Sequence, residues 1–283
     1  MDDPFFLLEA RIAIVGLGLI GGSLAKALKG RCAALYGVDA DSHTVSQAAS
    51  LGVVDMADVD PAVVLPLANI VILAAPVSVN LDYLGSLAKY HPGPAIVLDM
   101  GSTKIQITRA MQALPPHFDP IGGHPMCGKE KSGLENAEAR LFRGATFAFT
   151  PLARTSSRAL SFCKQLARVI GAKALWLDAE THDRWTAATS HFPYLIANTL
   201  AASTPPEAAP LVGPGFRSTT RLAVSSTRMM RDILATNREN VLESLSGFKR
   251  RLGEVEAMIT SGDFDALERL LAEGAERQKA LTI

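Results

Sequence analysis

Residues 12–24 read Ile-Ala-Ile-Val-Gly-Leu-Gly-Leu-Ile-Gly-Gly-Ser-Leu, an apolar run that ends in the spacing Gly16-x-Gly18-x-x-Gly21. A strand, a tight turn and a helix that together bind a dinucleotide have this pattern. Gly16 would let the strand turn sharply, Gly18 would let the backbone approach a pyrophosphate, and Gly21 would let the helix pack closely on the sheet. The free N–H groups at the helix N-terminus would then face the phosphates.

A second apolar run at residues 33–38 supports this prediction because it ends at Asp39. In such domains the acid that accepts hydrogen bonds from the adenine ribose follows the glycine turn by about 20 residues. A carboxylate at this place repels a 2′-phosphate, so the sequence favours NAD over NADP. The alternative is an α/β domain without a nucleotide, in which the glycines serve an ordinary turn.

Composition bounds the class of protein. The chain has 283 residues, which suffices for one or two domains. Lys plus Arg and Asp plus Glu each number 28, so a net charge of zero does not favour nucleic acid or an anionic membrane as partner. Cys32, Cys127 and Cys163 form neither a metal pattern nor a disulfide framework, which indicates a reducing, cytoplasmic compartment and no bound metal. We expect no signal peptide and no membrane span.

Strand-like and helix-like segments alternate as far as residue 177, which predicts a parallel sheet with helices on both faces. Helical patterns occupy residues 42–52, where Ser42 would be the N-cap and Gly52 the stop, and residues 157–170. Apolar runs predict strands at residues 11–15, 35–38, 70–76, 95–99, 145–151 and 173–177.

After Asp178 the pattern is helical only. It predicts one long helix at residues 181–200, which Pro193 would kink, a second at residues 238–259 and a short terminal helix around residues 264–271. We therefore predict an α/β fold with a Rossmann-type dinucleotide-binding domain at residues 1–177 and an all-helical domain at residues 178–283. The long apolar stripes need a partner within the domain or across a dimer interface.

Ligands of such sheets bind at the carboxyl ends of the strands. Ala75 and Pro76 end one apolar run there, either beside the nicotinamide or as an ordinary strand end. Ser102 follows the next strand and would project at the same edge, unless it only caps a helix. His124 is expected on a glycine- and proline-rich turn, where a neutral histidine could accept the proton of a substrate hydroxyl. The residues expected to contact the dinucleotide are Gly16, Gly18, Leu19, Ile20, Gly21, Asp39, Ala75 and Pro76.

Charged residues near these segments supply further candidates. Lys129, Glu130 and Lys131 follow His124 and make either a charged rim of the cleft or a solvated loop. A substrate carboxylate would pair with an arginine of the helical domain, because guanidinium binds carboxylates bidentately. The residue pattern alone does not choose among Arg217, Arg221, Arg228 and Arg231.

Taken together, the motifs resemble the prephenate/arogenate dehydrogenase family of tyrosine biosynthesis, from about Arg11 to about Val255. Order and spacing of five blocks carry the resemblance, and the third block is the most specific. The blocks are residues 15–23 (VGLGLIGGS), 99–104 (DMGSTK), 122–133 (GGHPMCGKEKSG), 190–193 (SHFP), and 215–221 (GFRSTTR) with 231–233 (RDI).

The resemblance implies a reaction and roles for residues. NAD would take hydride from the ring carbon that bears the hydroxyl of prephenate, and the ring carboxylate would leave as carbon dioxide. His124 would accept the hydroxyl proton, Ser102 would orient both His124 and the substrate hydroxyl, and Arg221 would bind the ring carboxylate. His191 would line the cleft from the helical domain, and that domain would form a homodimer.

Two departures from the family pattern concern the substrate. Tyr194 stands where a second histidine is common, and Lys129 stands where a small polar residue is common. An acidic partner would favour the amine of arogenate, and Glu130 is the nearby candidate. We expect prephenate, with arogenate as the alternative. Because the helical domain uses up the chain, tyrosine inhibition would act at the active site itself.

Two other functions remain open. A 3-hydroxyacid dehydrogenase would use a lysine on the first long helix of the second domain, but residues 181–200 contain no lysine. A non-catalytic NAD-binding sensor would not need Ser102, His124 and Arg221 together.

Overall fold

The computed structural model describes residues 6–129 and 131–281. The chain forms two compact units, Met1–Asn237 and Arg238–Ile283, and each is described by itself. The predicted domain boundary after residue 177 lies within the first unit and stays a prediction.

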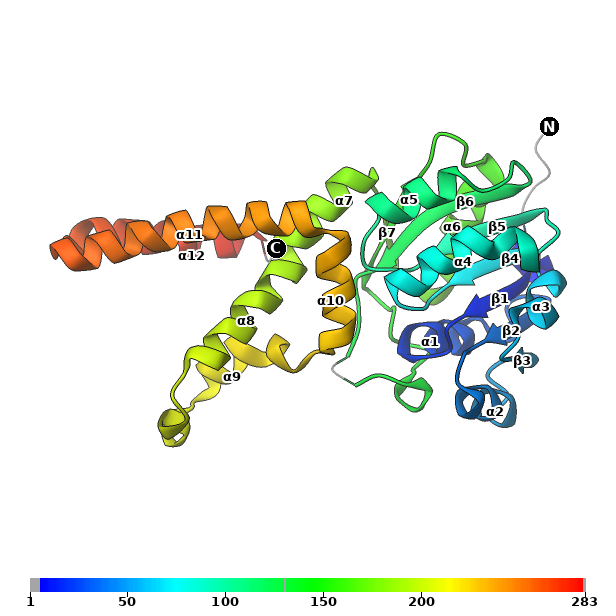
Figure 1. Ribbon diagram of the computed structural model, residues 1–283, viewed down its shortest axis with the longest axis horizontal. Helices are drawn as coiled ribbons and strands as arrows, with labels where there is room; N and C mark the ends of the chain where they lie inside the picture. Colours follow the sequence, from blue (N-terminus) through cyan, green and yellow to red (C-terminus); the bar gives the residue numbers. More distant parts are fainter. Residues whose placement is uncertain (1–5, 130, 282–283) are drawn as a thin grey trace. The chain divides into compact units, whose positions relative to one another are not determined.

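One twisted sheet forms the centre of the first unit (Figure 1). Its order across the described residues is β3-β2-β1-β4-β5-β6-β7-β8. Neighbours pair in parallel except β6 and β7, so the prediction of a parallel sheet was wrong for this one pair. The strands are β1 (Arg11–Val15), β2 (Ala34–Val38), β3 (Met56–Asp58), β4 (Ile70–Leu73), β5 (Ala95–Asp99), β6 (Phe118–Pro125), β7 (Thr146–Pro151) and β8 (Lys173–Trp176).

Helices cover both faces of the sheet, as the sequence predicted. Successive strand residues point to opposite faces, so Ile12 and Ile14 enter one core whereas Ala13 and Val15 enter the other. The helices of the first core are α1 (Leu19–Leu28), α2 (Ser42–Ser50) and α6 (Ser157–Ile170), and those of the second are α3 (Pro61–Val64), α4 (Val77–Tyr90) and α5 (Ile105–Gln112). The two cores bury the sheet on both of its faces.

Helix α2 begins at a different cap from the expected one. The Asp41 carboxylate accepts hydrogen bonds from the backbone N–H groups of His43 (3.1 Å) and Thr44 (3.2 Å), whereas Ser42 is already helical. Both residue types cap helices, and the extended backbone at Asp41 determines which one does.

The predicted long helix after Asp178 consists of three segments. Helix α7 (Ala179–Thr186) continues into a π-helical turn, Ala187–His191, and then into α8 (Phe192–Ser203). Pro193 has no N–H to donate to the preceding turn, and the wider turn accommodates this loss. Instead of the expected simple kink, the helix widens just before the proline. Helices α9 (Pro214–Thr220) and α10 (Thr227–Thr236) complete the unit, together with 3-10 turns at Leu7–Glu9, Leu65–Leu67, Leu134–Asn136, Pro206–Leu211 and Arg221–Val224.

The second unit is a hairpin of two helices, α11 (Arg238–Ser261) and α12 (Phe264–Leu281). Gly262 adopts a positive φ of 74° at the turn, and Arg251 forms an ion pair with Glu273 across the hairpin (2.8 Å). Helix α12 is longer than the short helix that the sequence predicted. Leu252 remains 55% exposed within this hairpin.

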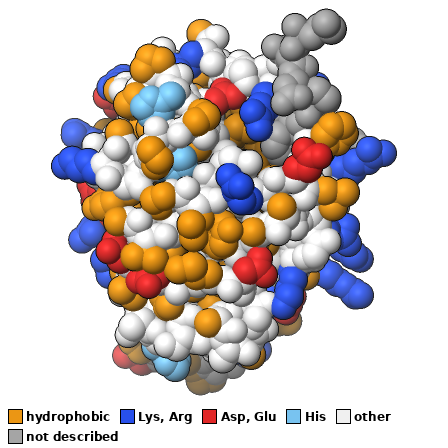
Figure 2. All heavy atoms as spheres, turned by 90° about the vertical axis from the view of Figure 1, so that its right-hand side faces the viewer, with side chains coloured by type: hydrophobic (Ala, Val, Ile, Leu, Met, Phe, Trp, Pro, Cys, Tyr) orange, Lys and Arg blue, Asp and Glu red, His pale blue; other side chains and the backbone are white. Residues whose placement is uncertain are grey.

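Hydrophobic and charged side chains are interspersed on the face of the molecule that Figure 2 shows. Scattered apolar side chains of this kind are ordinary for a protein surface. No helix among residues 6–129 and 131–281 is long and apolar enough to cross a membrane.

Candidate active site

The glycine turn between β1 and α1 has the predicted geometry. Gly16 adopts a φ of +90°, and a Cβ there would lie 2.8 Å from the backbone nitrogen of Ala75. A Cβ on Gly21 would collide with the carbonyl oxygen of Gly16, so the helix can approach the strand only because this residue is glycine. A Cβ on Gly18 would point into open space, which leaves room for a ligand to approach.

The start of α1 fits the phosphates of a dinucleotide. Gly18 is the N-cap and supplies no side-chain hydrogen bond, so the first N–H groups of the helix are free to bind an anion. Leu19 and Ile20, in this first turn, are half-buried. Asp39 accepts hydrogen bonds from the backbone N–H groups of Leu17 (2.7 Å) and Asp41 (3.0 Å). Its carboxylate oxygens keep further lone pairs for ribose hydroxyls, so the residues present fit NAD.

Asn80 joins two strand ends beside this turn. Its side-chain amide donates to Asp99 (2.8 Å) and to the carbonyl of Leu73 (3.2 Å), and its oxygen accepts from the N–H of Ala75 (3.2 Å). Pro76 follows as the N-cap of α4. The predicted positions of Ala75 and Pro76 at the carboxyl edge are confirmed, but their contact with the nicotinamide stays a prediction.

A buried lysine lies next to the histidine strand. The Lys104 ammonium pairs with the Asp99 carboxylate and donates to the carbonyl oxygen of Gly123 (2.7 Å). Both side chains of the ion pair are fully buried. Removing one partner of such a pair would leave the other charge buried without a counter-ion, which is strongly destabilising. The pair therefore fixes the end of β5 against β6.

His124 lies on strand β6, and the prediction that it lies on a turn was wrong. It pairs with Ala148 of the antiparallel strand β7, and its side chain is half-buried. The alternating pattern of the strand was hidden because Gly122 and Gly123 have no side chains. A Cβ on Gly123 would lie 2.9 Å from the ring of Phe147.

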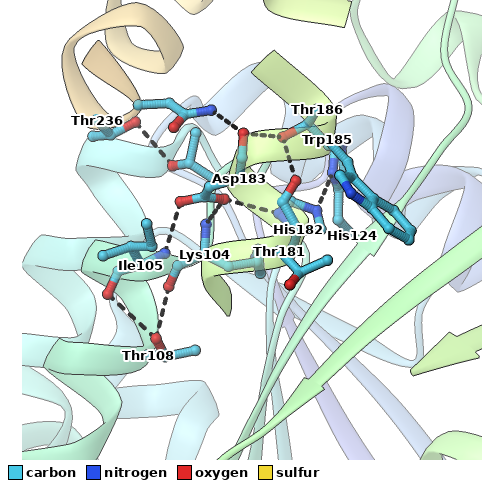
Figure 3. Close-up of polar contacts among 12 residues, drawn as sticks. Lys104, Ile105, Thr108, His124, Thr181, His182, Asp183, Trp185, Thr186 and Thr236 are labelled. Atoms are coloured by element: carbon cyan, nitrogen blue, oxygen red, sulfur yellow. Dashed lines mark hydrogen bonds and ion pairs between the residues drawn. The ribbon is translucent and has the colours of Figure 1, made fainter. Parts of the chain in front are cut away.

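The ring of His124 contacts a second histidine that no sequence motif marks. His124 Nδ1 lies 3.0 Å from His182 Nε2, and His182 Nδ1 lies 2.8 Å from Asp183 Oδ1 (Figure 3). His182 is only 1% exposed. The Asp183 carboxylate also accepts the backbone N–H groups of Lys104 (2.7 Å) and Ile105 (2.9 Å) at the start of α5. A carboxylate is well placed at a helix N-terminus, where the backbone carries partial positive charge.

His191 forms a separate contact on the other side of Asp183. The side-chain amide of Asn237 donates to the backbone carbonyl of Asp183 (2.7 Å) and lies 3.1 Å from His191 Nδ1. His191 is 1% exposed, and within the described part of the chain its Nε2 has no hydrogen-bond partner. A buried polar atom left in this way is unusual, and it can form a hydrogen bond to a ligand or a water molecule.

All three histidines are neutral near pH 7. Burial, together with His182 and Lys104, holds the pKa of His124 well below its usual 6.5. Burial also lowers the pKa of His182, although its bond to Asp183 opposes the shift. Burial lowers the pKa of His191 to about 4. A neutral His124 can therefore act as a proton acceptor.

The remaining predicted residues lie around this cluster. Ser102 lies half-buried between β5 and α5, and its hydroxyl makes no hydrogen bond to any described residue; the contact that orients His124 comes from His182. Lys129 pairs with Glu138 (2.5 Å) and donates to the carbonyl of Asn136 (3.2 Å). Glu130 lies outside the described residues.

Two predicted substrate contacts come from the helical segments. Tyr194 on α8 is buried against Met230 and Ile233. Arg221 is exposed and begins a 3-10 turn that packs against α8. The roles of both in binding substrate stay predictions. No group of three or more His, Cys, Asp or Glu side chains in residues 6–129 and 131–281 could hold a metal ion.

No motif marked His182, Asp183 and Asn237 in the sequence. The only available signal was the pattern of α7, where Asp178 caps the helix and places His182 and Asp183 in its second turn. Both are polar residues that the apolar stripe of that helix does not explain.

Two family models together match most of the chain. "Prephenate dehydrogenase, nucleotide-binding domain" matches residues 24–176, and "Prephenate dehydrogenase, dimerization domain" matches residues 178–273.

Individual relatives agree with the models. The prephenate dehydrogenase of Lactococcus lactis is 34% identical over 96% of this chain and 78% of its own. The crystal structure of Aquifex aeolicus prephenate dehydrogenase in complex with hydroxyphenyl propionate and NAD+ superposes with a TM-score of 0.88 at 29% identity, covering 99% of this chain and 100% of that one. Synechocystis arogenate dehydrogenase gives a TM-score of 0.81 at 30% identity, with 95% and 99% covered. The resemblance seen in the sequence is confirmed, and the chain belongs to the prephenate dehydrogenase family.

Proposed function

We propose that this chain catalyses the NAD-dependent oxidative decarboxylation of prephenate to 4-hydroxyphenylpyruvate in tyrosine biosynthesis. The observation that carries the proposal is the neutral, half-buried His124 at the carboxyl edge of the sheet whose glycine turn fits NAD. The named relatives, one of them crystallised with NAD+, support the same reaction.

His124 performs the proton transfer of this reaction. When bound, NAD supplies the acceptor for the hydride on the hydroxyl-bearing ring carbon. His124 accepts the hydroxyl proton as that hydride departs. The ring carboxylate leaves as carbon dioxide, and its bonding electrons enter the ring, which becomes aromatic. His124 returns the proton to the ring oxygen, so one prephenate and one NAD give one 4-hydroxyphenylpyruvate, one carbon dioxide and one NADH.

The other site residues bind and orient the substrate in this proposal. Arg221 pairs with the ring carboxylate, because guanidinium binds carboxylates bidentately. Ser102 orients the hydroxyl beside His124, and His191 and Tyr194 line the cleft. Lys129 and Glu130 form its rim. The cofactor contacts are the ones predicted from the sequence: Gly16, Gly18, Leu19, Ile20, Gly21, Asp39, Ala75 and Pro76.

Arogenate is the second candidate substrate. A relative described as an arogenate dehydrogenase, from Synechocystis, is 30% identical to this chain, compared with 29% for the prephenate dehydrogenase of Aquifex aeolicus. Arogenate differs from prephenate by an amine in place of a keto group, so a carboxylate such as that of Glu130 would favour it. The chemistry at His124 is the same for both.

The chain is expected to act as a homodimer in the cytoplasm. The family model that matches residues 178–273 describes a dimerization domain, and apolar side chains such as Leu252 are exposed on α11. Tyrosine would inhibit at the active site, because it shares the side-chain carboxylate of the substrate and the hydroxyphenyl ring of the product. Inhibition that is not competitive with substrate would contradict this last point.

Measuring NADH formation with prephenate and with arogenate in separate assays tests the reaction. We expect turnover of prephenate, and we expect His124→Asn to lower kcat on the order of 10²- to 10⁴-fold while NAD still binds. Turnover of arogenate alone would mean that arogenate is the substrate, with the same chemistry at His124. Failure to turn over either substrate, with NAD bound normally, would overturn the proposed reaction.

A further inference from the structure

Asp183 lies between two histidines and holds each of them through a different group. Its carboxylate accepts a hydrogen bond from His182 Nδ1 (2.8 Å), and His182 in turn contacts His124. Its backbone carbonyl accepts from the side-chain amide of Asn237 (2.7 Å), which in turn contacts His191. Figure 3 shows Asp183 between His182 and the start of α5. One residue therefore supports two separate hydrogen-bond networks, a His124 network that runs through His182 and a His191 network that runs through Asn237.

The His124 network determines which nitrogen of His124 carries the hydrogen. A carboxylate can only accept, so the hydrogen of His182 lies on Nδ1. Burial lowers the pKa of His182, so this ring is neutral and its Nε2 carries a lone pair. The contact of 3.0 Å then requires His124 Nδ1 to donate to His182 Nε2. The lone pair of a neutral His124 is consequently left at Nε2.

The His191 network fixes His191 in the opposite tautomer. A backbone carbonyl can only accept, so the Asn237 group beside Asp183 is the NH₂ group. The same NH₂ group faces His191 Nδ1, which must then accept. Because the pKa of His191 is about 4, its ring is neutral near pH 7 and its single hydrogen lies on Nε2. This Nε2–H and the Thr150 hydroxyl are the two buried side-chain groups without a hydrogen-bond partner among the described residues.

We infer that Asp183 imposes opposite tautomers on the two histidines, so that His124 presents a proton acceptor at Nε2 and His191 presents a hydrogen-bond donor at Nε2. Asp183, His182 and Asn237 are positioning residues in this arrangement. The assignment of the two nitrogens to one substrate rests on the proposed function. His124 would take the hydroxyl proton, and His191 would bind a carboxylate or carbonyl oxygen of the same molecule.

The arrangement explains why an unpaired donor is kept in the interior. A buried N–H without an acceptor destabilises the protein, and an oxygen of a ligand removes this penalty on binding. If His191 carried its hydrogen on Nδ1, it would oppose the NH₂ group of Asn237 and would offer no donor to the substrate. If His124 carried its hydrogen on Nε2, it could not accept the hydroxyl proton.

Nitrogen NMR of the full-length protein reads the tautomers directly. The chain is labelled with ¹⁵N-histidine, and the six histidines are assigned by replacing them one at a time. At pH 7.5, without substrate or NAD, we expect Nδ1–H for His124 and His182 and Nε2–H for His191. Nε2–H at His124 or Nδ1–H at His191 would overturn the inference. The result does not depend on which substrate the enzyme uses, so it is separable from the proposed function.

The kinetic constants of Asp183→Asn test the His124 network. The Oδ1 position faces both His182 Nδ1 and the backbone N–H of Lys104, and Oδ2 faces the N–H of Ile105, so the amide NH₂ group opposes a backbone donor in either orientation. With the NH₂ group at Oδ1, His182 must carry its hydrogen on Nε2, and His124 must then carry its hydrogen on Nε2 as well. We expect kcat to fall on the order of 10³- to 10⁴-fold with KM nearly unchanged, and the NMR signals of His124 to change to the other tautomer. Asp183→Leu offers His182 no acceptor at all, so a folded Asp183→Leu that keeps both the kcat and the tautomer of the parent would contradict the role of Asp183.

Asn237→Leu tests the His191 network. The loss of the NH₂ group frees His191 to adopt either tautomer, and we expect KM to rise about 10- to 100-fold with a smaller change in kcat. Thr236→Val is the matched control, because it removes the hydrogen bond of the neighbouring residue to Thr103 (2.8 Å) without touching a histidine. An equal rise in KM for both variants would mean that Asn237 is merely structural.

Discussion

At the scale of single residues, Gly21 connects the fold to the cofactor site. A Cβ at this position would collide with the carbonyl oxygen of Gly16, so Gly21→Ala must push α1 away from β1. We expect a loss of about 1–3 kcal/mol in unfolding free energy and a clear loss of NAD affinity, measured by urea unfolding and calorimetry. Gly85→Ala is the control: it lies in α4 facing open space, and it should stabilise by about 0.5–1 kcal/mol with NAD binding retained. Unchanged NAD binding in Gly21→Ala would contradict this account.

His191 also makes stability depend on pH. Its pKa is about 4 when folded and near 6.5 when unfolded, so the unfolded chain binds more protons between these values. The contribution of His191 to the free energy of unfolding is therefore fully present above about pH 6.5 and is lost as the pH drops towards 4. The loss amounts to roughly 3 kcal/mol, at about 1.4 kcal/mol per pH unit. Urea unfolding between pH 4.5 and 7.5 should show a shallower decline for His191→Gln than for the parent chain. Equal slopes for His191→Gln and the parent chain would refute the prediction.

At the scale of secondary-structure elements, the start of α2 depends on one side chain. Asp41 accepts two backbone N–H groups and the hydroxyl of Thr44, whereas Ser42 caps nothing. We expect Asp41→Ala to lower the Tm by about 2–4 °C and Ser42→Ala to leave it nearly unchanged, as measured by calorimetry. The reverse order of the two effects would restore Ser42 as the cap.

At the scale of the whole molecule, the α11–α12 hairpin should supply the dimer contact. Leu252 is 55% exposed in the single chain, and a family model for a dimerization domain matches this region. We expect light scattering to give twice the chain mass of 30.1 kDa for the parent and close to one chain mass for Leu252→Glu. Lys249→Glu, an exposed polar position on the same helix, should remain a dimer. A dimeric Leu252→Glu would move the interface away from this face.

Local patterns predicted the segments whose structure depends on neighbours in sequence. The strand at Arg11–Val15 and the helix at Ser157–Ile170 have the expected limits, because a run of apolar residues and a helical stripe between a Ser cap and a Gly stop are local signals. Strand β6 was missed because its two glycines carry no side chains to alternate. The π-helical turn before Pro193 was missed because the helical stripe continues through it.

The sequence by itself determined the dinucleotide turn, the NAD preference expected from Asp39, the family and the candidate base His124, because each rests on residue types at short, fixed spacings. Only the tertiary structure decided what holds that base. His124 and His182 are 58 positions apart, and Lys104 and Asp183 are 79 apart, so no spacing in the chain reveals that they touch. Their contacts exist because the sheet brings the ends of β5 and β6 together and α7 packs beside α5. Hydrogen bonds between distant residues set the protonation of the histidines, and such bonds form only in the folded chain.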